Sequence, residues 1–302
     1  MNISLKPIVH GANTMTDHRP SVLLPPKPAY ALFSGGKDSF ACASVLHEAG
    51  LLASCVLLDT GLSIPEWKAA TSAMCADRGW PYVIIPTNIR YEWFVWKYGF
   101  PGRPAHKWAM NYLKGRAVAQ WRSLHCTKVG KRKIFDGSIM ASGVRMDESE
   151  RRLGHTKPIS EWEKVTIYAP IFEWTTAETW AYVKAKGYVR PRAYDTLGIS
   201  GDCLCGAYAK EYEREAIRVH HPSIHADLVR MEHEYGSRWG AGDKACGRIK
   251  KQGTEAVGCA DCGDADMLPL QFASVDNGTK EQWDNDSTVE DRAVPSSVEA
   301  QT

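Results

Sequence analysis

The sequence predicts an α/β fold in which a largely parallel β-sheet carries helices on both faces. Short apolar runs that suit buried strands alternate with segments of helical apolar spacing, an alternation typical of parallel sheets. The first apolar run also leads through a glycine-rich turn directly into a helix. Five of the nine cysteines fall between positions 203 and 262, which predicts an additional C-terminal cysteine-rich module.

Changes in composition and the positions of prolines and glycines divide the chain of 302 residues into four expected parts. Clustered prolines block regular hydrogen bonding near the start, so residues 1–28 should form an irregular arm. The α/β domain is expected over residues 29–199, and the helical cysteine-rich module over residues 200–263. An acidic segment with few apolar residues predicts a disordered tail over residues 264–302.

Overall charge and hydropathy narrow the class of protein. A hydrophobic content of 44% and a charged content of 24% are those of a soluble globular protein, and the net charge of +2 does not by itself indicate a polyanionic partner. The sequence has neither a membrane-spanning apolar run nor a secretory signal pattern. Nine cysteines in such a chain predict a cytoplasmic protein that keeps thiols for ligation or chemistry.

The glycine-rich turn lies between a strand expected at residues 30–33 and a helix that begins near residue 39. Its two glycines let the backbone come close to a ligand. Free amides at the helix start, the helix dipole and the charge of Lys37 all attract anions. The turn is therefore predicted to bind phosphate, through Ser34, Gly35, Gly36, Lys37, Asp38 and Ser39.

A second buried strand is expected at residues 51–60, followed by a helix at 66–79 and a third strand at 81–86. In such sheets ligands bind at the carboxyl ends of the strands, where Asp59 falls. Asp59 therefore either meets a ribose or Mg²⁺, or caps the helix that follows.

Two segments after the third strand have alternative interpretations. The aromatic stretch 91–100 suits a packed surface or oligomer contact better than a base-stacking surface, and residues 99–104 suit a flap over the site.

The segment 121–133 is basic and contains Cys126. The neighbouring cations would favour the thiolate form of this cysteine. The alternative for this segment is a solvated basic helix face.

A further strand at residues 139–142 runs into Gly143-Val144-Arg145. Gly143 permits close approach, and Arg145 can grip phosphate oxygens bidentately. Arg151 and Arg152 either reach a sulfate, a second phosphate or a nucleic-acid backbone, or pair with neighbouring glutamates. Beyond them, Thr175 or Thr176 should cap a helix with Glu178 in its first turn.

The cysteine-rich segment predicts a metal module. Cys-x₂-Cys can wrap one metal ion, and four thiolates suit Zn²⁺ and an iron–sulfur cluster alike. A redox dithiol at Cys259 and Cys262 is the alternative. The candidate ligands are Cys203, Cys205, Cys246, Cys259 and Cys262.

Three ordered motifs resemble one known family: Ser-Gly-Gly-Lys-Asp-Ser at 34–39, Gly-Val-Arg at 143–145, and Pro-Ile-x-x-Trp-Thr at 170–175. They are similar to the phosphoadenosine phosphosulfate (PAPS) reductase family of the PP-loop ATP pyrophosphatases. The resemblance implies a PP-loop, Rossmann-like domain that binds an adenine nucleotide, either ATP with Mg²⁺ or PAPS. It also implies catalytic roles for Lys37, Ser39, Arg145 and Cys126, and it favours a [4Fe–4S] cluster over Zn²⁺.

The resemblance leaves three functions open. The first is ATP cleavage between the α and β phosphates for sulfur transfer or nucleic-acid modification, with a sulfur donor protein. A PAPS reductase using Cys126 or Cys262 is the second, although the C-terminal Glu-Cys-Gly-Leu-His-like motif of such reductases is absent. The third is a non-catalytic nucleotide-binding component of a modification or defence complex, with an oligomer possible.

Overall fold

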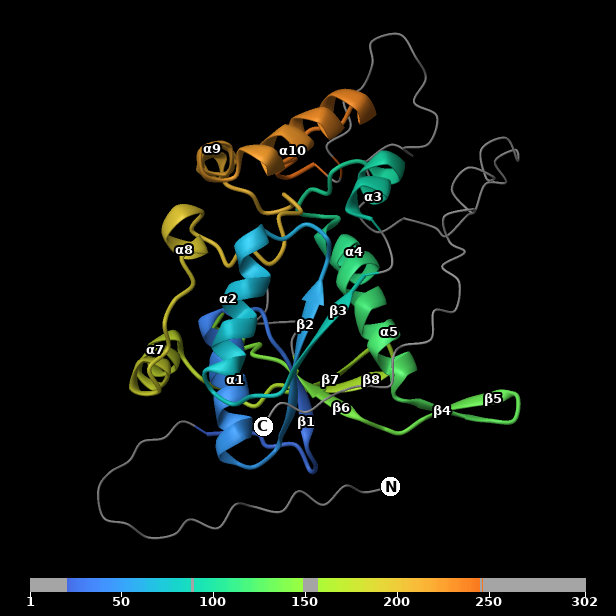
Figure 1. The fold of residues 1–302 in the computed structure, drawn as a ribbon, viewed down its shortest axis with the longest axis vertical. Coiled ribbons are helices and arrows are strands. Elements are labelled where there is room, and N and C mark those ends of the chain that lie inside the picture. The colour runs from blue at the N-terminus through green and yellow to red at the C-terminus, as the bar shows by residue number, and fades with distance from the viewer. Residues whose placement is uncertain (1–20, 88–89, 149–156, 245, 247–302) are drawn as a thin grey trace. The chain divides into compact units, whose positions relative to one another are not determined.

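A six-stranded sheet forms the centre of the part of the chain that the computed structural model describes, residues 21–87, 90–148, 157–244 and 246 (Figure 1). The strand order is β3-β2-β1-β6-β8-β7, and all neighbours are parallel except β7 and β8. The expected largely parallel sheet is confirmed. The strands are β1 (Ala29–Leu32), β2 (Leu52–Asp59), β3 (Tyr82–Pro86), β6 (Ile139–Ala141), β7 (Ile159–Trp162) and β8 (Val165–Tyr168).

Helices cover both faces of this sheet, as expected. On one face, Ala31, Leu57 and Ala141 share a core with α1, α2 and α7, while on the other face Val56 and Met140 pack against α5 (Figure 1). The helices are α1 (Lys37–Glu48), α2 (Pro65–Ala76), α3 (Tyr91–Tyr98), α4 (His106–Met110), α5 (Arg116–Leu124), α7 (Thr176–Ala185), α8 (Ala193–Thr196), α9 (Glu211–His220) and α10 (Pro222–Tyr235). A π-helical turn, Asn111–Gly115, joins α4 to α5.

Local sequence explains two of the helix starts. Thr175 caps α7 with a complete capping box, because its side chain accepts from the Glu178 amide while the Glu178 carboxylate accepts from the Thr175 amide. Helix α2 begins at Pro65, which suits the first helical position, and its N-cap residue is Ile64. The suggestion that Asp59 caps this helix is therefore wrong.

The helices after residue 200 belong to the same core as the sheet. Ile217 of α9, Leu228 and Met231 of α10, and Trp239 are buried in the cluster that contains β1 and α1. The aromatic stretch 91–100 also lies in this core, with Phe94 and Phe100 fully buried. Most of the stretch therefore packs within the domain, whereas Trp96 is 47% exposed, and the expected oligomer contact stays a prediction.

Residues 99–104 are held against the chain that follows α10. The Phe100 amide donates to the Ser237 hydroxyl at 2.8 Å, and the Arg103 amide donates to the Gly242 carbonyl at 2.8 Å. Pro101 also forms a β-bridge with Cys246. Because these hydrogen bonds fix residues 99–104 to the chain after α10, the segment is not the free flap that the sequence predicted.

The basic segment after α5 is a β-hairpin, which corrects the expected basic helix face. Among the described strands, β4 (Cys126–Val129) and β5 (Arg132–Phe135) pair only with each other, and Gly130 turns the chain at a φ of 59°. Helix α5 has already ended at Leu124, and the β-branched residues of the segment suit strands. The hairpin lies at the end of the domain remote from α9 and α10 (Figure 1).

Several sequence predictions concern residues outside the described part of the chain: residues 1–20, Arg151, Arg152, Cys259, Cys262 and the tail over residues 264–302.

Among the described residues, no helix is long and apolar enough to cross a membrane.

Candidate functional site

The turn between β1 and α1, residues 34–39, is called the phosphate loop below. Gly36 is the N-cap of α1, and no side chain in the described part of the chain caps this helix. The first intrahelical bond runs from the Phe40 amide to the Gly36 carbonyl at 2.9 Å, so the amides of Lys37, Asp38 and Ser39 have no partner within the helix. These amides and the dipole of a twelve-residue helix make an anion-binding end.

The carbonyl groups of the phosphate loop are bound by the surrounding protein. The Trp67 indole donates to the Ser34 carbonyl at 2.9 Å, and the Tyr188 hydroxyl donates to the Gly35 carbonyl at 3.0 Å. The Ser39 hydroxyl donates to the Gly36 carbonyl at 2.8 Å. Since its acceptors are occupied, the loop has mainly donors left for a ligand.

Two glycines allow close packing around this loop. Gly35 has a φ of +79°, and a Cβ there would lie 2.5 Å from Thr71 Cγ2. A Cβ on Gly143 would lie 2.4 Å from both the carbonyl carbon and the oxygen of Asp38. Gly143 therefore lets the chain after β6 pack against the start of α1, which gives its position a structural reason independent of a ligand.

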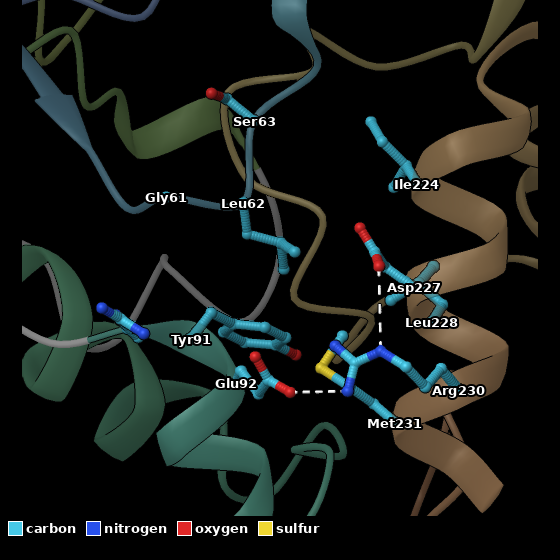
Figure 2. A pocket seen from close by; sticks show the side chains of 11 residues that line it. Gly61, Leu62, Ser63, Tyr91, Glu92, Ile224, Asp227, Leu228, Arg230 and Met231 are labelled. Carbon is cyan, nitrogen blue, oxygen red and sulfur yellow. Dashed lines mark hydrogen bonds and ion pairs between the residues drawn. The ribbon is translucent and has the colours of Figure 1, made fainter. Parts of the chain in front are cut away.

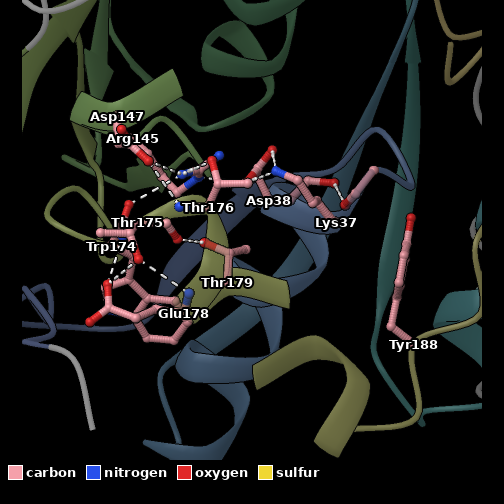
Figure 3. A network of polar contacts seen from close by, with 12 residues as sticks. Lys37, Asp38, Arg145, Asp147, Trp174, Thr175, Thr176, Glu178, Thr179 and Tyr188 are labelled. Carbon is pink, nitrogen blue, oxygen red and sulfur yellow. Dashed lines mark hydrogen bonds and ion pairs between the residues drawn. The ribbon is translucent and has the colours of Figure 1, made fainter. Parts of the chain in front are cut away.

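Asp38 lies between two cations (Figure 3). Lys37 Nζ is 2.7 Å from the Asp38 carboxylate, and Arg145 Nε donates to Asp38 Oδ1 at 2.6 Å. Arg145 is only 1% exposed, and its Nη1 donates to the Trp174 carbonyl at 3.2 Å. The structure thus places Arg145 behind Asp38, engaged with protein groups, whereas Lys37 is at the more open end of the network.

Asp59 lies at the carboxyl end of β2, at the same edge of the sheet as the phosphate loop. The side chain is 7% exposed, accepts from the Gly61 amide at 2.9 Å and pairs with Lys68 of α2. The neighbouring Thr60 hydroxyl is buried without a hydrogen-bond partner among the described residues. A buried hydroxyl of this kind could donate to a ligand at the edge.

Residues 200–206, called the cysteine loop, lie at this edge too. The Ile64 amide donates to the Gly201 carbonyl and the Leu204 amide donates to the Leu62 carbonyl, both at 2.9 Å. These bonds join the cysteine loop to the segment that follows β2. Cys203 and Cys205 are two positions apart in this loop, and each influences the pKa of the other.

A lysine–aspartate pair lies beside the two cysteines. Lys114, in the π-helical turn, is 2.7 Å from Asp202. The hydrogen bond from Cys205 and the positive charge of Lys114 lower the pKa of Cys203 to about 7, although burial and Asp202 oppose them. The pKa of Cys205 is raised because its sulfur donates this hydrogen bond and is buried. The pair is thus suited to hold one thiolate and one thiol near neutral pH.

A chain of contacts connects the cysteine loop to the phosphate loop. The Tyr194 hydroxyl would lie 3.0 Å from a Cβ on Gly36, so its tip reaches the phosphate loop. Ser200 and Asp202 of the cysteine loop both influence the pKa of Tyr194, and the Ser200 hydroxyl donates to Asp202. Burial, more than any other cause, raises the pKa of Tyr194 to about 12, so this hydroxyl remains a neutral donor.

The cysteines do not assemble as a metal site in the described part of the chain. Within residues 21–87, 90–148, 157–244 and 246, no three histidine, cysteine or acidic side chains are placed to hold one metal ion. Cys203 and Cys205 lie in one loop, and Cys246 forms a backbone bridge with Pro101. Cys259 and Cys262 lie outside the described residues, so the four-thiolate site expected for Zn²⁺ or a [4Fe–4S] cluster stays a prediction.

Cys126 is not brought to the phosphate loop. It pairs with Phe135, just before β6, and β6 begins opposite Ala29, the first residue of β1. The Lys27 ammonium, which precedes β1, donates to the Gly137 carbonyl at 2.6 Å. Cys126 is therefore at the edge where β1 and β6 begin, while the phosphate loop follows the end of β1.

A cavity of about 320 Å³ lies between α3, α10 and the segment after β2 (Figure 2). Tyr91 lines it and donates its hydroxyl to the Cys205 carbonyl at 2.9 Å, so the cavity adjoins the cysteine loop. Arg230 also lines it and is held by Glu92 at 2.7 Å. The remaining lining residues are Gly61, Leu62, Ser63, Arg90, Glu92, Ile224, Asp227, Leu228 and Met231.

Sequence reasoning missed the residues that support the two loops. Asp202 could have been noticed because it precedes Cys203, but nothing in the sequence connects Lys114 to the cysteines. Tyr188 and Tyr194 come after the last family motif, in a part of the sequence where no motif indicates a functional residue. Their positions depend on long-range packing.

Fold and loop together define the chain as a PP-loop protein: an open, largely parallel α/β domain with an uncapped helix start after β1. The family model of the phosphoadenosine phosphosulfate reductase domain matches residues 28–264, so the chain belongs to that family. A search of curated protein sequences found no match.

Two solved structures are similar in part. One is phosphoadenylyl-sulfate (PAPS) reductase from Candida auris in its phosphate complex, at 14% identity and a TM-score of 0.38, covering 57% of this chain and 78% of that one. The other is a predicted subunit of tRNA methyltransferase from Methanocaldococcus jannaschii, at 16% identity and a TM-score of 0.33, covering 52% and 74%.

Proposed function

We propose that this protein binds an adenine nucleotide at the phosphate loop and cleaves ATP between its α and β phosphates to drive sulfur transfer. The observation that carries the proposal is the uncapped start of α1 with Lys37 beside it, in a chain of the PAPS reductase family. Amides and ammonium would stabilise the charge that develops as pyrophosphate leaves. Ser34 and Ser39, with hydroxyl oxygens 3.3 Å apart, would keep the loop in this shape.

In this proposal a Mg²⁺ ion that enters with the phosphates would meet Asp59, which pairs with Lys68, because Asp38 is already held between Lys37 and Arg145. Mg²⁺ is commonly held by one or two carboxylates together with substrate oxygens. Arg145 would be a positioning residue, because it bonds Asp38 and is itself buried.

The test measures nucleotide binding and pyrophosphate release with ATP and with PAPS. Both are measured for the full-length protein and for its Lys37→Ala variant. We expect Lys37→Ala to abolish pyrophosphate release, while Lys184→Ala, an exposed lysine on α7, should leave it unchanged. Release that survives Lys37→Ala would remove the phosphate loop from the mechanism. Tight ATP binding without turnover, alone and with nucleic acid, would instead favour a non-catalytic nucleotide-binding component.

A PAPS reductase is the second candidate, favoured by the dithiol at Cys203 and Cys205 beside the phosphate loop. Cys126 is not at this edge, so it does not support the reductase. The assay is sulfite formation from PAPS with a thiol donor. Sulfite no higher than in an enzyme-free control would exclude it.

We also propose nucleic acid as the sulfur acceptor, on the basis of the basic hairpin formed by β4 and β5. Between residues 122 and 135 the chain has five cations and no acid. Lys128 and Lys133 are directly opposite each other, an arrangement that costs free energy unless an anion lies between them. A phosphate backbone would supply that anion.

A further inference from the structure

We propose that the hairpin formed by β4 and β5 is a two-stranded ribbon that enters the major groove of duplex DNA and contacts its base edges. The inference rests on the proposed function, because it names the kind of nucleic acid that the hairpin accepts. Binding itself needs neither a bound nucleotide nor ATP cleavage. Four features of the hairpin support the inference: its faces, its charges, its shape and its anchored base.

The pairing register divides the hairpin into two faces. Residues directly opposite each other in an antiparallel pair share a face, and successive pairs point to opposite faces. Lys128 and Lys133 therefore share one face with Phe135. The opposite face, called the outer face below, consists of Thr127, Val129, Arg132 and Ile134. All four of these outer residues are exposed.

The outer face presents branched apolar side chains in place of aromatic rings. Val129 is 56% exposed and Ile134 is 52% exposed. Phe135, the only aromatic residue between positions 126 and 135, packs against the core and meets the Trp121 ring edge-on. Proteins that bind single strands stack bases on aromatic side chains. Branched apolar groups suit the thymine methyl, which lies in the major groove of the duplex.

Cations surround this outer face. Lys128 and Lys133 lie on the other face, Lys131 is in the turn, and no acid occurs between positions 126 and 135. The next acid, Asp136, accepts from the Ser138 amide at 2.7 Å. A DNA groove offers base edges on its floor and phosphates along both walls. Apolar groups on one face and cations around it match this arrangement.

The shape of the hairpin suits the major groove of DNA. Gly130 and Lys131 form a two-residue connection, and the φ of 59° at Gly130 is typical of the tight turns in such ribbons. Paired strands lie about 4.8 Å apart, whereas the major groove is about 12 Å wide and about 8.5 Å deep. The major groove of an RNA duplex is too narrow for side chains to read. Duplex DNA is therefore the nucleic acid that the ribbon fits.

The base of the hairpin is anchored to the domain. The Arg122 guanidinium lies 4.9 Å from the centre of the Phe135 ring, and the Asp136 amide donates to the His125 carbonyl at 3.0 Å. Beyond this base the hairpin projects away from the sheet (Figure 1). A projecting ribbon with a fixed base loses little conformational entropy when it enters a groove.

The test titrates full-length protein into labelled DNA and follows fluorescence anisotropy, with an A·T-rich duplex of about 20 base pairs, or two helical turns. A single strand offers the lysines only its phosphates, so it should bind more weakly than the duplex. Duplex RNA of the same sequence should also bind more weakly. A duplex with uracil in place of thymine lacks only the methyl groups, and its affinity should fall several-fold.

The variant Val129→Thr with Ile134→Thr retains β-branching and strand propensity and removes the apolar ends of both side chains. It should bind the thymine duplex about tenfold more weakly. It should lose nothing further with uracil and bind the single strand unchanged. Val219→Thr is the matched control, because Val219 on α9 is also 56% exposed. Urea unfolding checks that each variant keeps its fold.

Four results would overturn the proposal: equal affinity for the duplex and its separate strand, equal affinity for the thymine and uracil duplexes, an equal loss in Val219→Thr, or binding to anionic vesicles in place of DNA. Lys37→Ala should abolish pyrophosphate release and leave duplex binding unchanged. Failure of the hairpin to bind DNA is thereby distinguished from failure of the phosphate loop to cleave ATP.

Discussion

Arg145 donates from Nε to Oδ1 of Asp38 at 2.6 Å, although 107 positions separate the two residues in the sequence. This contact joins the chain that leaves β6 to the first turn of α1, directly behind the phosphate loop (Figure 3). The same carboxylate receives Lys37 from the other side. One aspartate is therefore shared by both cations, and the Trp174 carbonyl accepts a further hydrogen bond from Arg145.

Removing this arginine should destabilise the fold. Arg145→Met removes the buried cation behind Asp38. Breaking a fully buried ion pair costs about 3–5 kcal/mol, and the loss here should be smaller because Asp38 is 25% exposed and keeps Lys37 as a partner. The matched control is Arg190→Met, because Arg190 and Asp195 are both about half exposed and such surface pairs contribute about 0–1 kcal/mol. Urea unfolding measures both variants. Equal losses of unfolding free energy would contradict a structural role for Arg145.

Gly143→Ala should be destabilising because of one contact. The added Cβ would lie 2.4 Å from the Asp38 backbone, and overpacking of this kind costs about 1–3 kcal/mol. It should also weaken ATP binding, since the start of α1 must shift. Gly50→Ala is the comparison: its φ is +66° but the space around it is open, so only backbone strain applies and the nucleotide affinity should not change.

Lys128→Glu should have opposite effects on stability and on nucleic-acid binding. The substitution converts the opposed pair of Lys128 and Lys133 into an ion pair, which should stabilise the hairpin by about 0.2–1 kcal/mol. Binding of single-stranded nucleic acid should weaken, and the slope of log affinity against log salt should fall by about 0.7 for each lost phosphate contact. Lys184→Glu controls for net charge. Unaltered binding with Lys128→Glu would eliminate the hairpin as a nucleic-acid contact.

Cys203 should react with iodoacetamide in a pH range lower than that of an ordinary thiol. The Cys205 hydrogen bond and Lys114 lower its pKa to about 7, so the alkylation rate should rise through neutral pH and level off above it. Lys114→Met removes the cation and leaves Asp202 unpaired, so the midpoint should move to higher pH, and Lys114→Arg should return it. A midpoint that is the same in all three proteins would show that Lys114 does not act on this thiol.

Cys126→Ser should leave pyrophosphate release, sulfite formation and ATP affinity unchanged. The thiol lies at the edge where β1 and β6 begin, and its sulfur donates to the Arg122 carbonyl at 3.3 Å. Loss of turnover without loss of stability would show that Cys126 reaches the active site by a movement absent from this structure. Cys203→Ser, measured in the same assays, tests the cysteine that lies at the same edge of the sheet as the phosphate loop.

Local patterns in the sequence were sufficient for the sheet, the phosphate loop and the start of α7. Apolar runs of strand length, two glycines before a helix, and a threonine three residues before a glutamate each act over a few neighbouring residues. The PP-loop family could be identified for the same reason, since its motifs are short and ordered. The basic segment was harder, because Lys128 and Lys133 suit a helix face and a hairpin equally well until α5 is seen to end at Leu124.

What the sequence alone determined is the strand–turn–helix unit that attracts phosphate, because its amides and its lysine are neighbours along the chain. Only the tertiary structure decided the roles of the remaining groups. Arg145 lies behind Asp38 instead of facing solvent, Cys126 is at the far edge of the sheet, and Lys114 meets Asp202 across 88 positions. These relationships depend on which strands pair and which helices cover them, and the free energy of that packing is distributed over the whole core.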